Sequence, residues 1–126
     1  MKILKSKLFL TLLIVMSFVV TASVLMPRPI DMNLDKIGNG QKSVVFAYDL
    51  NLTVSNKQTI EINKARKLVG DDVNFLVVKV GDPQTSDFRS RHRVKSSDVL
   101  FFNASGELVD RQVALLSAAA LVERVQ

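Results

Sequence analysis

The side chains that could do chemistry in this chain are few and widely spaced. Ser55 lies six residues after Asp49, and such a pair would suit a hydrolase if a histidine base lay beside it. The chain has one histidine, His92, and no Gly-x-Ser-x-Gly motif. We therefore interpret Ser55 as the cap of a helix, and His92 as a packing or capping residue near a helix end.

Other reactive groups are also sparse. The chain has no cysteine, which excludes disulfides, thiolate metal ligands and a cysteine nucleophile. Asp71, Asp72, Asp82 and Asp87 lack the spacing of a metal-binding loop, so we interpret them as turn and cap residues. A single histidine also argues against a histidine-built metal site. The sequence thus predicts no catalytic residue, no metal and no cofactor, and hence a protein that is not an enzyme.

One dense basic run is present, formed by Arg89, Arg91, Arg93 and Lys95. It is a candidate patch for anionic lipid headgroups, an acidic partner or nucleic acid. The alternative is a solvated helix end, where cations interact favourably with the helix dipole. From Thr21 onward the chain has 14 basic and 12 acidic residues, a net charge of +2. Because this excess is small, we expect no nucleic-acid partner.

The N-terminal segment has the pattern of an export signal. Met1 to Lys7 is basic, and Leu8 to Met26 is an uncharged apolar run of 19 residues. Such a segment is either a cleaved signal peptide or a single transmembrane anchor, and both place the following domain across a membrane. We therefore divide the chain into residues 1–26 as signal or anchor, 27–41 as linker, and 42–126 as one domain.

The pattern of the domain predicts alternating strands and helices. Short apolar runs predict strands, and capped amphipathic runs predict helices. The predicted order is β-α-β-α-β-β-α, preceded by the N-terminal apolar helix, with a hairpin between the last two strands. The expected strands are 43–48, 73–80, 99–102 and 107–113, and the expected helices are 55–69, 82–92 and 117–125.

Several short motifs along the domain share the spacing of one known fold family. They are Val45-Phe46-Ala47-Tyr48, Val94 to Phe102, Gly106-Glu107 and Val113 to Ser117. Together with the element order, they resemble the thioredoxin-like fold family from Lys42 to about Val125. The resemblance implies an α/β domain built on a mixed four-stranded sheet, but a fold of this kind does not specify a function.

The chain departs from this family at the positions of its chemistry. Leu52-Thr53-Val54-Ser55 stands where the redox Cys-x-x-Cys would be, with Leu52 and Ser55 at the two cysteine positions. Asp98 takes the place of the family's cis-proline, and a cis bond before a non-proline residue costs about 3–4 kcal/mol, so we expect a trans bond there. Since a thiolate is the nucleophile of thiol–disulfide exchange, the resemblance implies a redox-inactive member.

The expected function is therefore a non-catalytic interaction module. The resemblance implies an exported protein of the bacterial periplasm, either soluble or anchored in the inner membrane through residues 8–26. We expect an accessory subunit of an envelope assembly of the secretion or conjugation type. The alternative is a periplasmic peptide-binding chaperone without cysteine chemistry, with its groove between residues 49–55 and 95–99.

The expected contact with a protein partner is a sheet edge. The strand Val73 to Val80 is strongly apolar and would lie at an edge, where proteins normally cover or pair the backbone. Arg28 to Leu34 could fold back onto it, or a partner or second copy could add a strand. Pro27 and Pro29 make the first segment a poor strand, so the sequence favours pairing with another chain.

Overall fold

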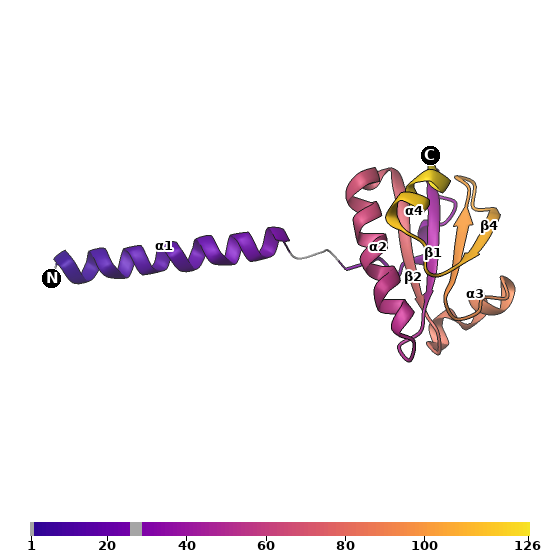
Figure 1. Cartoon of the computed structure of the whole chain (residues 1–126), viewed down its shortest axis with the longest axis horizontal. Coiled ribbons are helices and arrows are strands. Elements are labelled where there is room, and N and C mark those ends of the chain that lie inside the picture. Colours follow the sequence, from indigo (N-terminus) through magenta and orange to yellow (C-terminus); the bar gives the residue numbers. More distant parts are fainter. Residues whose placement is uncertain (1, 26–28) are drawn as a thin grey trace.

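The computed structural model describes the backbone of residues 2–25 and 29–126, and the side chains of residues 5–19 and 29–126 (Figure 1). The first element, α1 (Lys2–Leu25), stands apart from the folded domain, and its described side chains are exposed. Within this described part of the chain, no helix has both the length and the apolar character needed to cross a membrane.

The domain is built on four strands in the order β2-β1-β3-β4. The strands are β1 (Lys42–Tyr48), β2 (Val73–Lys79), β3 (Asp98–Phe102) and β4 (Leu108–Val113). β1 pairs parallel to β2 and antiparallel to β3, and β3 pairs antiparallel to β4 with an irregularity between Phe101 and Phe102. This is the mixed four-stranded sheet that the sequence predicts.

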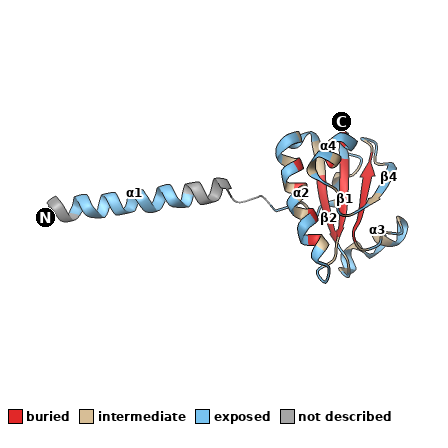
Figure 2. Ribbon diagram, in the orientation of Figure 1, coloured by how far each residue is buried: buried red, intermediate tan, exposed pale blue. Residues whose placement is uncertain are grey.

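Helices cover both faces of the sheet. α2 (Thr53–Val69) and α4 (Ala118–Val125) pack on one face, and α3 (Ser86–Arg91) packs on the other (Figure 1). Because successive strand residues point to opposite faces, the central strands contribute side chains to two apolar clusters, one on each face of the sheet. These strands are buried along most of their length (Figure 2). The cluster under α2 and α4 contains Phe46, which is fully buried.

The ends of the helices confirm some of the expected caps and correct one of them. Ser117 Oγ accepts a hydrogen bond from the Ala120 N–H at 3.2 Å, as expected of an N-cap. The prediction that Ser55 caps α2 is wrong, because the helix begins at Thr53 and Leu52 is its N-cap residue. Ser55 lies inside the first turn and is fully buried, so its side chain cannot serve the helix start.

The segment before β1, which the sequence predicts as a linker, is folded onto the domain. We call residues 29–37 the strap; it contains a 3₁₀ turn at Leu34–Lys36. Asp31 forms a parallel bridge with Leu76, and its carbonyl accepts the Val77 N–H at 2.9 Å. The sequence favoured pairing of β2 with another chain over this fold-back. At Leu76, in the middle of β2, the structure has the fold-back instead.

Apolar contacts on both faces of the sheet explain why the strap docks despite its prolines. Ile30 packs against the cluster under α2 and α4, and Leu34 and Ile37 pack against the cluster under α3. The strap pairs with β2 only through the residues around Asp31, so the missing N–H of Pro29 costs no ladder bond.

Candidate functional site

The segment 52–55 lies at the carboxyl end of β1, in the first turn of α2. Leu52 is exposed, whereas Ser55 is fully buried. The Ser55 N–H donates to the Leu52 carbonyl at 3.1 Å, and Ser55 Oγ accepts the Asp49 N–H at 3.0 Å. The serine therefore holds the loop between β1 and α2 in place, and its oxygen is engaged inside the protein.

Asp98 lies at the start of β3 and is buried, with only 5% of its surface exposed. Its carboxylate accepts a hydrogen bond from the Lys95 N–H at 2.8 Å and another from Arg111 Nη1 at 2.9 Å. The Arg111 guanidinium also donates to the backbone carbonyls of His92 and Arg93. The Ser97–Asp98 bond is trans, as expected for a non-proline residue. Asp98 is thus the anchor of the loop that leads into β3.

The two loops that would form a peptide-binding groove are joined to each other. Ser96 Oγ donates to Asp49 Oδ2 at 2.8 Å, and the Ser97 N–H donates to the Ala47 carbonyl at 3.0 Å. The Asn51 N–H, and then the Ser96 hydroxyl, lower the pKa of the Asp49 carboxyl. A hydrogen bond therefore bridges the space between residues 49–55 and 95–99 where the chaperone alternative would place a peptide.

The cations of the basic run have different roles. Arg89 reaches back to the segment before α3, donating to Thr85 Oγ1 at 3.0 Å and to the Asp82 carbonyl at 3.1 Å. Arg91, Arg93 and Lys95 are exposed at the end of α3 and in the turn that follows. Arg111, which no sequence pattern marks, reaches this turn from β4.

His92 packs against aromatic rings, which confirms the packing interpretation. Its ring lies 4.7 Å from the Phe88 ring and 5.3 Å from the Phe102 ring, measured between centroids. Burial, followed by the neighbouring charges of Arg91 and Arg111, lowers the pKa of His92 below its usual 6.5. Burial therefore favours the neutral form of the imidazole.

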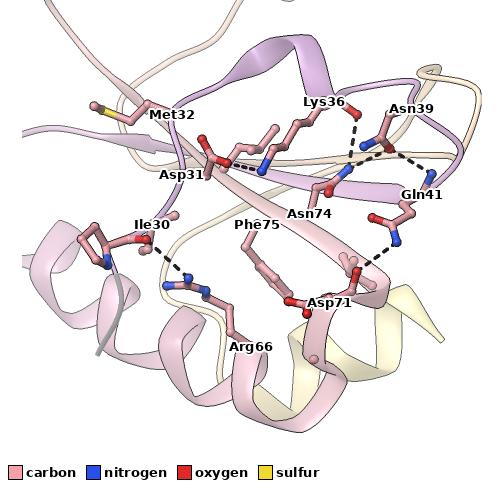
Figure 3. Close-up of a pocket in the computed structure, with 14 residues that line it drawn as sticks. Ile30, Asp31, Met32, Lys36, Asn39, Gln41, Arg66, Asp71, Asn74 and Phe75 are labelled. Atoms are coloured by element: carbon pink, nitrogen blue, oxygen red, sulfur yellow. Dashed lines mark hydrogen bonds and ion pairs between the residues drawn. The ribbon is translucent and has the colours of Figure 1, made fainter. Parts of the chain in front are cut away.

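A cavity lies between the strap and β2 (Figure 3). We call it the strap cavity; its volume is about 670 Å³. The first half of β2 forms its floor, and residues of the strap, of the loop before β1 and of α2 form its walls. The lining residues are Pro29, Ile30, Asp31, Met32, Lys36, Asn39, Gln41, Arg66, Gly70, Asp71, Val73, Asn74, Phe75 and Leu76.

Hydrogen bonds fix the wall of the cavity that precedes β1. Asn74 Nδ2 lies within hydrogen-bond distance of the Lys36 carbonyl, Asn39 Oδ1 and Ser43 Oγ, at 3.0–3.2 Å. Gln41 Nε2 donates to the Asp71 carbonyl at 2.9 Å, so this wall is also tied to the turn before β2 (Figure 3). The wall is therefore preformed and polar.

The strap and α2 complete the cavity. The Asp31 carboxylate forms an ion pair with Lys36 and accepts a hydrogen bond from its ammonium group. This hydrogen bond is the main cause that lowers the pKa of Asp31. Arg66 donates to the Pro29 carbonyl at 3.4 Å from the α2 side (Figure 3). Sequence reasoning missed the cavity because its walls come from segments far apart in the chain, and the apolar pattern of β2 was the one signal that pointed near it.

Matches to known proteins are found with the structure of this chain and not with its sequence. No protein-family model matches the sequence, and no curated protein matches it significantly. An uncharacterized thioredoxin-like protein from Clostridium perfringens has a similar structure, with a TM-score of 0.67, 10% identity and 75% of each chain covered. Identity this low shows a shared fold alone.

Two further solved structures are similar. One is thioredoxin-2 of the malaria parasite, described as a component of its protein secretion machinery, with a TM-score of 0.60, 16% identity, and 68% of this chain and 81% of that chain covered. The other is the exposed lipoprotein thioredoxin of Streptococcus pneumoniae, with a TM-score of 0.62, 16% identity, and 70% and 85% covered. The fold is thus thioredoxin-like, and the absence of cysteine leaves it without dithiol chemistry.

Proposed function

We propose that this protein is an exported, redox-inactive protein-binding module that serves as an accessory subunit of an envelope assembly of the secretion or conjugation type. The observation that carries the proposal is the structural use of Ser55 and Asp98. Ser55 Oγ holds the Asp49 amide, and the Asp98 carboxylate holds Arg111 and the Lys95 amide. Polar groups engaged in this way support the loops of a scaffold and are not presented to a substrate.

The export part of the proposal is supported by the N-terminal segment. Basic residues precede an uncharged apolar run, and the large apolar side chains of this run are exposed, among them Leu8, Phe9 and Phe18. Exposed apolar surface of this extent indicates a segment recognised by a membrane or by an export apparatus. Two of the structural neighbours are themselves described as an exposed lipoprotein and as a component of a secretion machinery.

The experiment that tests the proposal is affinity purification of the full-length protein from detergent-solubilised membranes of cells that make it. One partner recovered in a fixed stoichiometric ratio supports a subunit. A broad set of unfolded clients would favour the chaperone alternative, and recovery of the protein alone would contradict both.

Export is tested separately from partner binding. We expect protease added outside the cytoplasmic membrane to digest the domain, because that is the side on which an exported domain lies. N-terminal sequencing then distinguishes the two forms of export. A start at Thr21 or Ser23 indicates a cleaved signal, and an intact Met1 indicates a retained segment. A domain protected from protease until the cytoplasmic membrane is broken would contradict export.

A further inference from the structure

The backbone of β2 presents hydrogen-bonding groups to the strap cavity. The Val80 N–H donates to the Tyr48 carbonyl of β1 at 2.9 Å, whereas the Val77 N–H donates to the Asp31 carbonyl on the opposite side. Since backbone direction alternates along a strand, Val73 and Phe75 direct their N–H and carbonyl groups as Val77 does, away from β1. Both residues line the strap cavity.

The strap already shows that this side of β2 accepts an extended chain. Asp31 occupies the position opposite Leu76 and makes a main-chain bond of 2.9 Å to Val77. Two residues before Asp31, the Pro29 carbonyl accepts from Arg66 on α2, and Pro29 forms no bridge with β2. The first half of β2 is therefore left at the floor of a cavity (Figure 3).

The size of the strap cavity suits a short extended peptide. One residue of an added strand fills roughly 160 Å³, from a rise of about 3.3 Å, a strand spacing of about 4.8 Å and a sheet spacing of about 10 Å. A cavity of about 670 Å³ thus has room for roughly four residues. Its walls are polar, with Lys36 on the strap side, Arg66 on the α2 side, and Gln41 hydrogen-bonded to the Asp71 carbonyl at one end.

The other edge of the sheet is closed to such pairing. The outer strand β4 has a register irregularity near its start, opposite Phe101 and Phe102. The Arg111 N–H is bonded to Asp110 Oδ1 at 2.8 Å, so a carboxylate occupies the edge. Bulges and charged side chains are the usual devices that keep an edge strand from pairing. Of the two edges of the sheet, β2 is therefore the one suited to an added strand.

We propose that the strap cavity binds an extended segment of a partner protein, about four residues long, which adds to β2 through main-chain hydrogen bonds to Val73 and to the Phe75 N–H. This inference rests on the proposed function, because it names the site through which the module holds its partner. Recognition depends on the backbone of the segment, and the polar walls select polar side chains.

The test uses the full-length protein in detergent and a phage-displayed library of random heptapeptides as the probe. Peptides selected on the protein are expected to slow hydrogen exchange at the Val73 and Phe75 amides. Asp71→Trp fills the cavity and is expected to weaken binding at least about tenfold, as loss of two or three main-chain hydrogen bonds would. Asp72→Trp is the matched control, because Asp72 is also exposed in the same turn but does not line the cavity.

The outcomes separate this inference from the proposed function. Peptides that bind both variants equally, that leave the Val73 and Phe75 amides unchanged, or that cannot be selected at all would overturn the inference. Gln41→Trp also fills the cavity, from the segment before β1, and provides a second test if Asp71→Trp does not fold. A cellular partner that still binds both filled variants would overturn the strap cavity as the site while leaving the proposed function intact.

Discussion

Arg111 on β4 and Asp98 on β3 form an ion pair at 2.9 Å, in which the carboxylate is buried and the guanidinium is partly exposed. The same guanidinium donates to the carbonyls of His92 and Arg93, so one side chain joins β4, β3 and the turn after α3. This arrangement fixes the loop that leads into β3.

Arg111→Ala should destabilise the domain by about 2–3 kcal/mol, because it leaves the Asp98 carboxylate buried with only a backbone donor. The matched control is Arg124→Ala, which breaks the more exposed pair with Asp110 and should cost about 1 kcal/mol or less. Urea unfolding of both variants measures the difference. Equal losses in the two variants would show that Asp98 does not depend on Arg111.

Gln58 gives a second prediction about stability. Its fully buried side chain donates to the Leu116 carbonyl at 2.9 Å and accepts the Leu116 N–H at 2.7 Å, which ties α2 to the segment before α4. Gln58→Leu leaves both backbone groups without a partner and should cost about 2–4 kcal/mol. Gln84→Leu, at an exposed position, should change the unfolding free energy by about 0.5 kcal/mol or less. A small effect at Gln58 would contradict the described pairing.

His92 predicts how stability depends on pH. Its pKa is lowered in the folded protein, so the unfolded chain binds more protons as the pH falls below about 6.5. The free energy of unfolding should be constant above that pH and should decrease between it and the lower folded pKa. Because His92 is the single histidine, His92→Phe should remove this dependence while keeping an aromatic ring. A slope that persists in His92→Phe would assign the effect to another group.

An engineered pair of cysteines tests the placement of the degenerate redox turn. Leu52→Cys together with Ser55→Cys puts two thiols across the first turn of α2, where Ser55 N–H and the Leu52 carbonyl are 3.1 Å apart. The two should form an intramolecular disulfide on mild oxidation, seen as the loss of two hydrogens by mass spectrometry. Persistence of two free thiols under those conditions would count against this alignment with the family.

The sequence allowed the element order, the mixed sheet and the apolar N-terminal helix to be predicted, because periodicity and turn residues are local signals. It did not reveal the role of Ser55, since a serine near a helix start resembles a cap until the first turn is seen to begin at Thr53. It also did not show that the strap docks on the domain. Ile30 and Leu34 hold the strap by packing against clusters on the two faces of the sheet, and these faces exist only in the folded domain.

The strap cavity and the Asp98–Arg111 pair were beyond sequence reasoning for the same reason. Each joins residues that only the folded sheet brings together, such as Gln41 with Asp71, or Arg111 with the turn after α3. No local pattern marks those positions, and a single sequence gives no second chain against which to compare them.

The central claim is that this thioredoxin-like domain works by holding a protein partner. The most direct measurement is the mass of the native complex that contains it, determined after gentle detergent extraction from cells that make it at their normal level. We predict one heteromeric complex of defined mass, larger than the chain and its detergent, which shifts when the partner is removed. If the extracted protein is found only at the mass of the single chain with its detergent, the account is contradicted.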